Sequence, residues 1–248
     1  MTRYCGGKNR IGLEIAKSIY DVVNILSKKY DITFNGYIEP FVGMAGVYRH
    51  IPDLFNNYKK VHSYNFNYKA SDINPSVILM WKDVQQGRHD NFPKFVDKEL
   101  YDQIKDDPRP SSTKGFVGCA NTFRGIYLST YEEKTSNNTG AINRVMEVGS
   151  QLQNVQFTCC NYDKFNSRTL KNYILYLDPP YTTNPKYYDE ERNKLSFNHH
   201  TFWKWALEMS KNNLVFMSEY EIPKEYDSNV TEVWTQLNGN EKLFIILP

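Results

Sequence analysis

The sequence predicts an α/β fold built around a mostly parallel sheet, and three observations lead to this class. Short strand-like runs, apolar or alternating, are bounded by polar residues at 155–160, 173–177 and 214–220. Apolar residues at helical spacing accompany these runs at 11–26, 141–152 and 197–210. A glycine-containing turn at 43–46 follows an earlier apolar segment. Strands that alternate with helices favour parallel pairing, because each parallel pair needs a crossover connection.

Composition excludes several classes of protein. The chain has 248 residues, which suits one large domain or a domain that carries an insert. The net charge of +2 gives no protein-wide basic field, so any nucleic-acid contact must come from a local patch. Four cysteines without C-x-x-C spacing favour free thiols in a reducing compartment. No apolar run approaches a signal peptide or the about 20 residues of a membrane span, so we expect a soluble, intracellular protein.

The N-terminal segment Gly7-Lys8 directly precedes the first predicted helix. Backbone N–H groups at a helix N-terminus, together with the Lys8 ammonium, can face an anion. The alternative is a loose N-terminal turn. A phosphate-binding P-loop is excluded, because G-x-x-x-x-G-K-[ST] is absent.

The segment 37–47 reads as a strand that enters a turn, with a helix expected to start near Val47. Gly43 and Gly46 would let a ligand approach the backbone closely. Two glycines spaced by three do not form G-x-G-x-x-G, which argues against a dinucleotide-binding oxidoreductase.

Asp72 follows Gly46 by about 26 residues, at the end of the next predicted strand. An acid near this distance from a glycine turn suits a pair of ribose hydroxyls. The alternative is that Asp72 caps the N-terminus of the following helix. We predict a loop at 55–69, leading into this strand.

Residues 80–140 interrupt the alternation of strands and helices, because prolines and charges are frequent there. Basic and acidic residues are equal in number, and we predict an insert in the α/β core. Within it, 114–131 combines glycines, rings, Asn and Arg, which suits contact with bases and phosphates. The alternative is a buried glycine-rich loop. The candidate DNA contacts are Lys114, Asn121, Phe123, Arg124 and Tyr127.

The tetrapeptide Asp178-Pro179-Pro180-Tyr181 follows the apolar run 173–177. It therefore lies at the carboxyl end of a buried strand, the edge at which open α/β sheets bind ligands. Prolines cannot continue a strand ladder and stiffen the turn. The polar stretch after Tyr181 is a candidate lid, and the tail at 232–234 and 242–247 is expected to add an antiparallel end.

Several motifs agree in type and order with one family. The sequence resembles the Dam-type (Asp-Pro-Pro-Tyr) site-specific DNA adenine-N6 methyltransferases, and its 115–125 segment is most similar to phage and viral members. The motifs are Gly-Gly-Lys (6–8), Glu-Pro-Phe-Val-Gly (39–43), Ser-Asp-Ile-Asn-Pro (71–75), Asp-Pro-Pro-Tyr (178–181), Phe-Asn-His (197–199) and Val-Phe-Met-Ser-Glu-Tyr (215–220).

The resemblance implies a seven-stranded, mostly parallel, Rossmann-like sheet that uses S-adenosylmethionine (AdoMet) and releases S-adenosylhomocysteine. Residues 1–79 and 141–248 would form the catalytic domain, and 80–140 a small, mainly helical target-recognition insert. The implied substrate is the exocyclic N6 amine of a flipped-out adenine in double-stranded DNA, with no metal and no membrane. A partner restriction endonuclease and a homodimer are left open.

The family's site residues map onto this sequence with one departure. The family usually has an acid and an aromatic residue after the strand at 155–160, where this chain has Asn161-Tyr162. Asn161 can still accept from an amine through its carbonyl oxygen, and Asp163 is the alternative if the register slips by two. The implied cofactor contacts are Gly7, Lys8, Glu39, Phe41, Gly43, Gly46, Asp72, Asn161, Tyr162 and Asp178, and the implied catalytic residues are Asp178, Pro179, Pro180 and Tyr181.

The residue types suit transfer to an amine. The Asp178 carboxylate and the Pro179 carbonyl can each accept one N–H bond, which makes a conjugated amine more nucleophilic. Tyr181 can stack on an extruded base. Three alternatives are methylation of RNA, a cytosine amine or a glutamine amide; a DNA-binding relative with weakened catalysis; and a nucleotide-binding oxidoreductase. Asp178 favours adenine, because relatives that act on other amines often carry Asn or Ser there.

Overall fold

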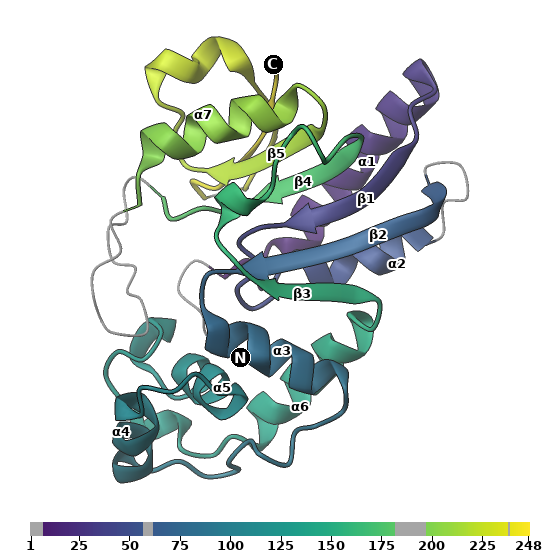
Figure 1. The fold of residues 1–248 in the computed structure, drawn as a ribbon. Coiled ribbons are helices and arrows are strands. Elements are labelled where there is room, and N and C mark those ends of the chain that lie inside the picture. Colours follow the sequence, from purple (N-terminus) through teal and green to yellow (C-terminus); the bar gives the residue numbers. More distant parts are fainter. Residues whose placement is uncertain (1–6, 57–61, 182–196, 238) are drawn as a thin grey trace.

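The computed structural model describes residues 7–56, 62–181, 197–237 and 239–248, and it contains one seven-stranded sheet (Figure 1). The strand order is β3-β2-β1-β4-β5-β7-β6. The strands are β1 (Phe34–Glu39), β2 (His62–Asp72), β3 (Val155–Cys159), β4 (Tyr173–Leu177), β5 (Leu214–Glu219), β6 (Val230–Thr235) and β7 (Lys242–Ile246). The α-helices are α1 (Gly12–Tyr30), α2 (Ile51–Asn56), α3 (Pro75–Gln85), α4 (Lys98–Asp106), α5 (Ser112–Ala120), α6 (Thr139–Gln151) and α7 (His199–Ser210).

Strand direction decides which side chains can meet. β1 pairs in parallel with β2 and β4, and the parallel pairing continues to β3 on one side and β5 on the other. β7 runs antiparallel to both β5 and β6. The predicted mostly parallel sheet with an antiparallel end is therefore confirmed. The carboxyl ends of β1 to β5 share one edge, and the start of β7 lies at that same edge.

The sheet is covered on both faces, which explains why every residue of its central strand β4 is buried. Along β4, Ile174 and Tyr176 pack into one buried cluster, while Leu175 and Leu177 pack into another on the opposite face. The first cluster includes buried residues of α1, α2 and α3, and the second includes those of α7. Figure 1 shows α7 on one side of the sheet and α1 and α2 on the other.

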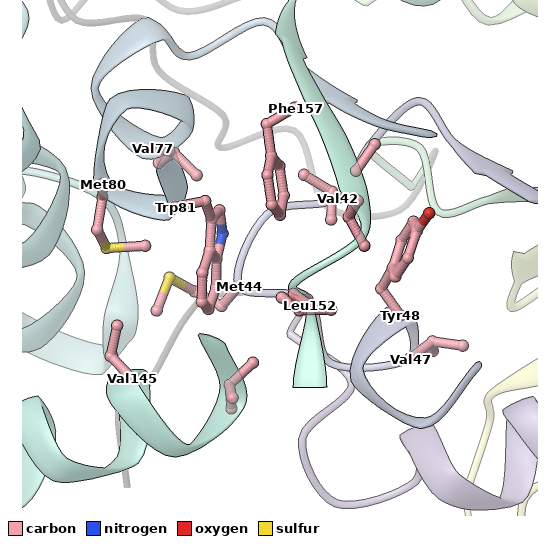
Figure 2. Close-up of a cluster of buried hydrophobic side chains, with 14 of the residues drawn as sticks. Val42, Met44, Val47, Tyr48, Val77, Met80, Trp81, Val145, Leu152 and Phe157 are labelled. Carbon is pink, nitrogen blue, oxygen red and sulfur yellow. The ribbon is translucent and has the colours of Figure 1, made fainter. Parts of the chain in front are cut away.

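A buried cluster supports the turn that follows β1 (Figure 2). The Trp81 ring of α3 stacks on Phe157 of β3, with 6.2 Å between ring centroids. Its indole N–H donates to the Gly43 carbonyl oxygen at 2.8 Å, so the polar atom of this buried ring is satisfied. Met44 packs in the same cluster. Side chains of α3 and β3 thereby hold the turn in place.

The 80–140 segment is mainly helical and shares the core of the sheet. Phe116 of α5 belongs to the same buried cluster as Trp81. A Cβ at Gly115 would come within 2.2 Å of the Ser76 carbonyl oxygen, so glycine permits α5 to lie directly against α3. α3 extends to Gln85 and α6 begins at Thr139, so both proposed domain boundaries fall inside helices.

Two predicted elements differ in the structure. The predicted loop at 55–69 was wrong for 62–69, because β2 begins at His62. Aromatic and polar residues alternate at 64–68, a strand period hidden by the many Asn and Lys residues. The helix expected near Val47 begins as the short turn η1 (Tyr48–His50) and continues as α2. The candidate lid at 182–196 lies outside the described residues. Among the described helices, none is long and apolar enough to cross a membrane.

Candidate functional site

The carboxyl ends of the first three strands are tied together by backbone hydrogen bonds. After β1, the Val42 N–H donates to the Ser71 carbonyl oxygen of β2 at 2.9 Å. After β3, the Cys160 N–H donates to the Asp72 carbonyl oxygen at 3.1 Å. The glycine turn, Asp72 and Asn161 are therefore neighbours along one edge, as the sequence predicted. Asp178 follows β4, the next strand beyond β1.

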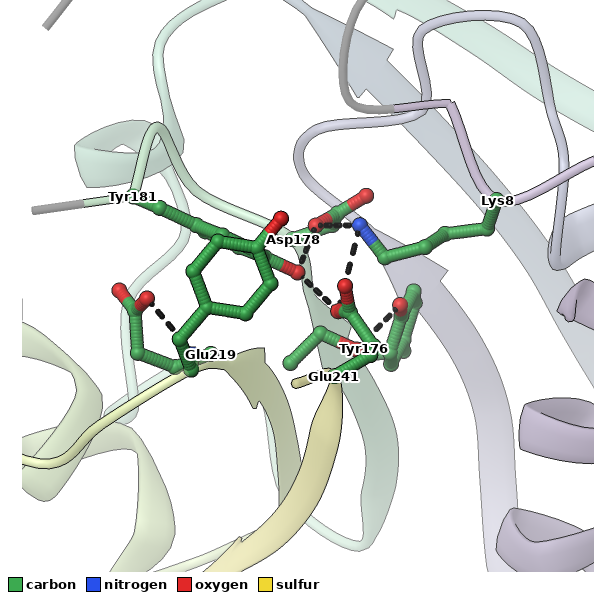
Figure 3. A network of polar contacts seen from close by, with 8 residues as sticks. Lys8, Tyr176, Asp178, Tyr181, Glu219 and Glu241 are labelled. Atoms are coloured by element: carbon green, nitrogen blue, oxygen red, sulfur yellow. Dashed lines mark hydrogen bonds and ion pairs between the residues drawn. The ribbon is translucent and has the colours of Figure 1, made fainter. Parts of the chain in front are cut away.

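Lys8 reaches across this edge to Asp178 (Figure 3). Its Nζ lies 2.6 Å from Asp178 Oδ1, and the Lys8 side chain is only 5% exposed. Burial lowers the pKa of the Lys8 ammonium, but the Asp178 and Glu241 carboxylates together raise it above its ordinary value. Lys8 is therefore a charged, buried partner of the catalytic candidate.

The backbone around Lys8 is held by the glycine turn. The Lys8 carbonyl oxygen accepts from the N–H groups of Ile11 and Gly12, where α1 begins. A Cβ at Gly46 would lie 3.0 Å from the Lys8 nitrogen, so the glycine lets the two segments touch. The structure thus places Lys8 in an ordered start of α1 rather than in a loose turn, while Gly7 beside it is exposed.

Tyr181 and Glu241 complete the polar cluster. The Tyr181 hydroxyl lies 3.1 Å from Asp178 Oδ1 and also donates to Glu241 Oε1. Burial, with the nearby Asp178 and Glu241 carboxylates, raises the pKa of Tyr181 well above its ordinary value, so it remains a neutral donor. Asp178 Oδ2 takes part in no hydrogen bond within the described chain, and the Asp178 side chain is 18% exposed. This oxygen is the available acceptor of the site.

Glu39 is a second buried carboxyl group near the same edge. The Tyr37 hydroxyl donates to its Oε1 at 2.7 Å. Burial raises the pKa of Glu39 well above its ordinary value, and the Asp178 charge adds to this, while Tyr37 and Lys8 oppose it. The structure therefore favours the neutral form of Glu39 more than water does.

Asp72 supports the turn through its side chain. Its Oδ2 accepts from the Gly43 N–H and its Oδ1 from the Asn74 N–H, each at 2.9 Å. Burial raises the pKa of Asp72, and these backbone donors oppose the shift. Asn74 rather than Asp72 caps α3, by accepting from the N–H groups of Ser76 and Val77. Each Asp72 oxygen keeps a lone pair for a further donor such as a ribose hydroxyl.

Aromatic rings line the same edge beside Asn161. Phe41 lies 5.6 Å from Tyr162 and 6.1 Å from Phe197 between ring centroids, and both Phe41 and Phe197 are half-buried. Asn161 is half-buried and its Oδ1 accepts from the Tyr162 N–H, whereas Asp163 is exposed. AdoMet contains a purine, a ribose and a cationic sulfonium group. Aromatic rings suit the purine, an acid suits the ribose hydroxyls, and further acids suit the sulfonium charge. The residue types at this edge therefore fit this cofactor.

The candidate DNA contacts divide into two groups. Lys114, Asn121 and Tyr127 are buried, as the alternative expected, although residues 112–120 form helix α5 rather than a loop. Lys114 Nζ donates to the Asp107 carbonyl oxygen, and Asn121 exchanges amide hydrogen bonds with Asn138. Phe123 and Arg124 are exposed in the loop between them, with Arg124 in the left-handed backbone region.

Glu241 is the residue of the cluster that the sequence did not indicate. It lies 60 residues after Tyr181 and directly precedes an antiparallel strand. No motif contains it. Its position follows only from the pairing of β7 with β5, which joins Lys242 to Glu219.

Comparisons with known proteins agree with the geometry over part of the chain. Residues 116–236, just under half of the chain, match the model of the D12 class N6 adenine-specific DNA methyltransferase family. The match includes Asp178 and Tyr181 but not Lys8 or Glu241. It supports the family that the motifs resemble.

Solved structures give only distant likenesses. The rRNA methyltransferase AviRa from Streptomyces viridochromogenes is 12% identical, with 94% of this chain and 84% of that chain covered at a TM-score of 0.43. A conserved hypothetical protein from Streptococcus pyogenes is 9% identical, with 90% and 93% covered at a TM-score of 0.35. Neither is close enough to bear on function. A comparison with curated proteins finds no match.

Proposed function

We propose that this protein transfers the methyl group of AdoMet to the N6 amine of adenine in double-stranded DNA, at a specific sequence. The observation that carries the proposal is the position of Asp178. Its Oδ2 is available at the carboxyl edge of the sheet, beside the glycine turn after β1, while Oδ1 is held by Lys8 and Tyr181. The family match over 116–236 includes this residue.

The chemistry proposed for the site is activation of a poor nucleophile. The lone pair of the adenine amine is delocalised into the ring. Asp178 Oδ2 and the Pro179 carbonyl oxygen each accept one N–H, which favours a tetrahedral nitrogen whose lone pair can attack. AdoMet supplies an electrophilic methyl group. The protein therefore acts mainly by positioning the amine and by stabilising the positive charge that develops on it.

The cofactor is proposed to lie along the edge from Asp72 to Asp178. Asp72 would accept from the ribose hydroxyls, and the half-buried ring of Phe41, beside the buried ring of Tyr162, would contact the adenine. Lys8, Gly43 and Gly46 would line the part of the cofactor site that lies nearest Asp178. This assignment keeps the contacts that the resemblance implied.

The base is proposed to stack on the tyrosines beside Asp178. The Lys8 ammonium lies 4.8 Å from the centroid of the Tyr181 ring, and Tyr220 contacts that ring edge-on at 4.7 Å. Tyr181 is buried and Tyr220 is half-buried, so we add Tyr220 as a second stacking candidate for an extruded adenine.

We propose that Phe123 and Arg124, the two exposed candidates in the insert, contact the DNA bases. The Arg124 guanidinium lies 5.1 Å from the centroid of the Phe123 ring, so the two side chains present one cationic, aromatic surface. Arg124 suits a guanine edge in the major groove. Lys114, Asn121 and Tyr127 would hold this loop in place rather than touch bases.

Transfer of radiolabelled methyl from AdoMet tests the proposal. Duplex DNA, RNA and protein are each offered to the full chain, and the labelled DNA is hydrolysed to separate N6-methyladenine from N4-methylcytosine. We expect label in N6-methyladenine, and we expect Asp178→Ala to abolish it while Asp21→Ala, at an exposed position of α1, keeps it. Label on RNA, cytosine or protein alone would contradict the proposed substrate, and binding of DNA without transfer would indicate a relative with weakened catalysis.

A further inference from the structure

Glu241 enters the polar cluster from the antiparallel end of the sheet. Lys242 pairs with Glu219, so the residue before it lies beyond the carboxyl end of β5. The Gln236 N–H donates to the Glu241 carbonyl oxygen at 2.8 Å, which closes the connection between β6 and β7. The Glu241 side chain is buried and points at Tyr181 and Lys8 (Figure 3). A buried carboxylate needs such partners.

Two donors and two acceptors form a closed ring in this cluster. Lys8 Nζ lies 2.6 Å from Asp178 Oδ1 and 3.5 Å from Glu241 Oε1. The Tyr181 hydroxyl contacts the same two oxygens. The Lys8 ammonium and the Tyr181 hydroxyl thus each lie between two carboxylates, that of Asp178 after β4 and that of Glu241 before β7. Among the described residues, the side-chain contacts of Asp178 fall on Oδ1, which leaves Oδ2 for a substrate.

We propose that Glu241 is a positioning residue for methyl transfer, which shares the Lys8 ammonium and the Tyr181 hydroxyl with Asp178 and so keeps the Asp178 carboxylate an effective acceptor for the amine. This inference rests on the proposed function. It identifies a residue outside the family match, which ends at 236.

The charges of the cluster explain why a second carboxylate is useful. With Lys8, Asp178 and Glu241 ionised, the cluster carries one net negative charge. A cationic methyl donor, and then a cationic amine, are each balanced by that charge. Without Glu241, Lys8 and Asp178 form a pair with no net charge. The Lys8 ammonium and the Tyr181 hydroxyl then both act on Asp178 alone. No net negative charge remains to balance an incoming cation.

Protonation of Glu241 should switch this contribution off. Burial raises its pKa, with the Asp178 charge adding to the effect and Lys8 opposing it. The groups that face Glu241 are Lys8, Asp178 and Tyr181 in contact, with Tyr176 of β4 and Tyr220 after β5 nearby. The ionised, active form is therefore lost as the pH falls through the raised pKa of Glu241.

The test compares Glu241→Gln with Glu232→Gln, the same substitution on the exposed face of the same hairpin. Glu232 pairs with Lys242 at 3.0 Å and lies away from the cluster. The rate of the first turnover is measured with labelled AdoMet and duplex DNA from about pH 5.5 to about pH 9. We expect Glu241→Gln to lower the rate about 10- to 100-fold near neutral pH and to move the acid limb of the pH–rate profile to lower pH. Glu232→Gln should match the wild type.

Several outcomes decide the inference. A Glu241→Gln variant with the wild-type rate, or with a lower rate but an unmoved acid limb, overturns the positioning role, because a merely structural residue would scale the rate at every pH. If that variant fails to fold, Glu241→Asp decides: a lower rate with a displaced acid limb supports the role, and a rate that is unchanged or scaled equally at every pH overturns it. A wild type that methylates no nucleic acid overturns the proposed function itself, and the role of Glu241 with it.

Discussion

Lys8 and Asp178 are separated by 170 positions in the chain and form an ion pair of 2.6 Å at the carboxyl edge of the sheet. The pair joins the start of α1 to the end of β4, two elements that share no strand pairing. Because Lys8 also approaches Glu241, it neutralises one of two buried carboxylates and makes the site sensitive to its removal.

The Lys8→Met variant should be less stable and less active. Loss of the ammonium leaves Asp178 and Glu241 facing each other, and breaking a buried ion pair costs about 3–5 kcal/mol. The folded-state pKa of Lys8 is raised above its ordinary value of 10.5, so its stabilisation is fully present below that value and is lost only at higher pH. The deficit should shrink as the pH falls and one carboxylate is protonated.

Denaturant unfolding at about pH 5.5 and about pH 8 checks this prediction, with Lys17→Met as the control. Lys17 is exposed on α1, so its variant should unfold like the wild type at both values. Equal stability of the Lys8→Met and wild-type proteins at the higher pH would contradict the proposed balance of charges.

Arg124→Ala should weaken DNA binding and relax the choice of site. A bidentate Arg–guanine contact is worth about 1–3 kcal/mol, so we expect about 10- to 100-fold weaker binding to the preferred sequence. Arg168→Ala is the control, because Arg168 is exposed just before β4, at the opposite edge of the sheet. Titration of duplexes and sequencing of methylated DNA measure the two effects. Unchanged affinity and site choice in the Arg124 variant would remove it from the interface.

Local sequence patterns predicted most of the sheet because its central strands are buried on both faces. The apolar run 173–177 and the run 214–220 needed no tertiary information to be recognised as β4 and β5. β2 was predicted too short, because its first residues mix rings with Asn and Lys and resemble a loop in composition. Its alternation was the available signal, and pairing with β1 and β3 supplies the stabilisation that composition does not show.

The site was predictable where a residue lies within a motif, either before a helix, as Lys8 does, or at a strand end. Asp178 and Asp72 met this condition. For Lys114 and Asn121 the sequence left burial and DNA contact as two alternatives. A long polar side chain is usually exposed, and only the carbonyl and amide partners seen in the structure decide for burial. Glu241 had no local signal, because an antiparallel strand brings it to the edge from the opposite direction.

Glu39→Gln should remove a pH dependence of stability, leaving stability almost unchanged below the ordinary pKa of Glu39 and raising it relative to the wild type at higher pH. Burial raises the folded-state pKa of Glu39 well above its ordinary value of 4.5, so its favourable contribution is present below that value and is lost as the pH rises through the raised pKa. Glutamine keeps an acceptor for the Tyr37 hydroxyl, so the change in stability below the ordinary pKa of Glu39 should stay below about 1.5 kcal/mol.

Thermal unfolding across a pH series that starts near the ordinary pKa of Glu39, 4.5, and continues to alkaline values distinguishes the two proteins. The wild type should lose stability with rising pH more steeply than the Gln variant. Glu39→Ala is the matched comparison, because it leaves the buried Tyr37 hydroxyl without this acceptor, at a cost of about 1–3 kcal/mol at every pH. Parallel pH curves for wild type and Gln variant would show that Glu39 does not titrate as described.

Asn161→Asp should tighten the binding of AdoMet, because it restores the acid that the resembling family carries at this place. Asn161 is half-buried beside Phe41 and Tyr162, at the edge where the cofactor's adenine is proposed to lie. Replacing the carboxamide by a carboxylate turns a neutral acceptor into a charged one, and charge-assisted hydrogen bonds are roughly twice as strong as neutral ones. We expect about a tenfold lower Kd, corresponding to about 1.4 kcal/mol. Calorimetric titration of AdoMet measures it, and Asp163→Asn is the control. If the Asp163 variant instead loses affinity and the Asn161 variant gains none, the exposed Asp163 is the residue that meets the adenine, and the register after β3 is displaced by two.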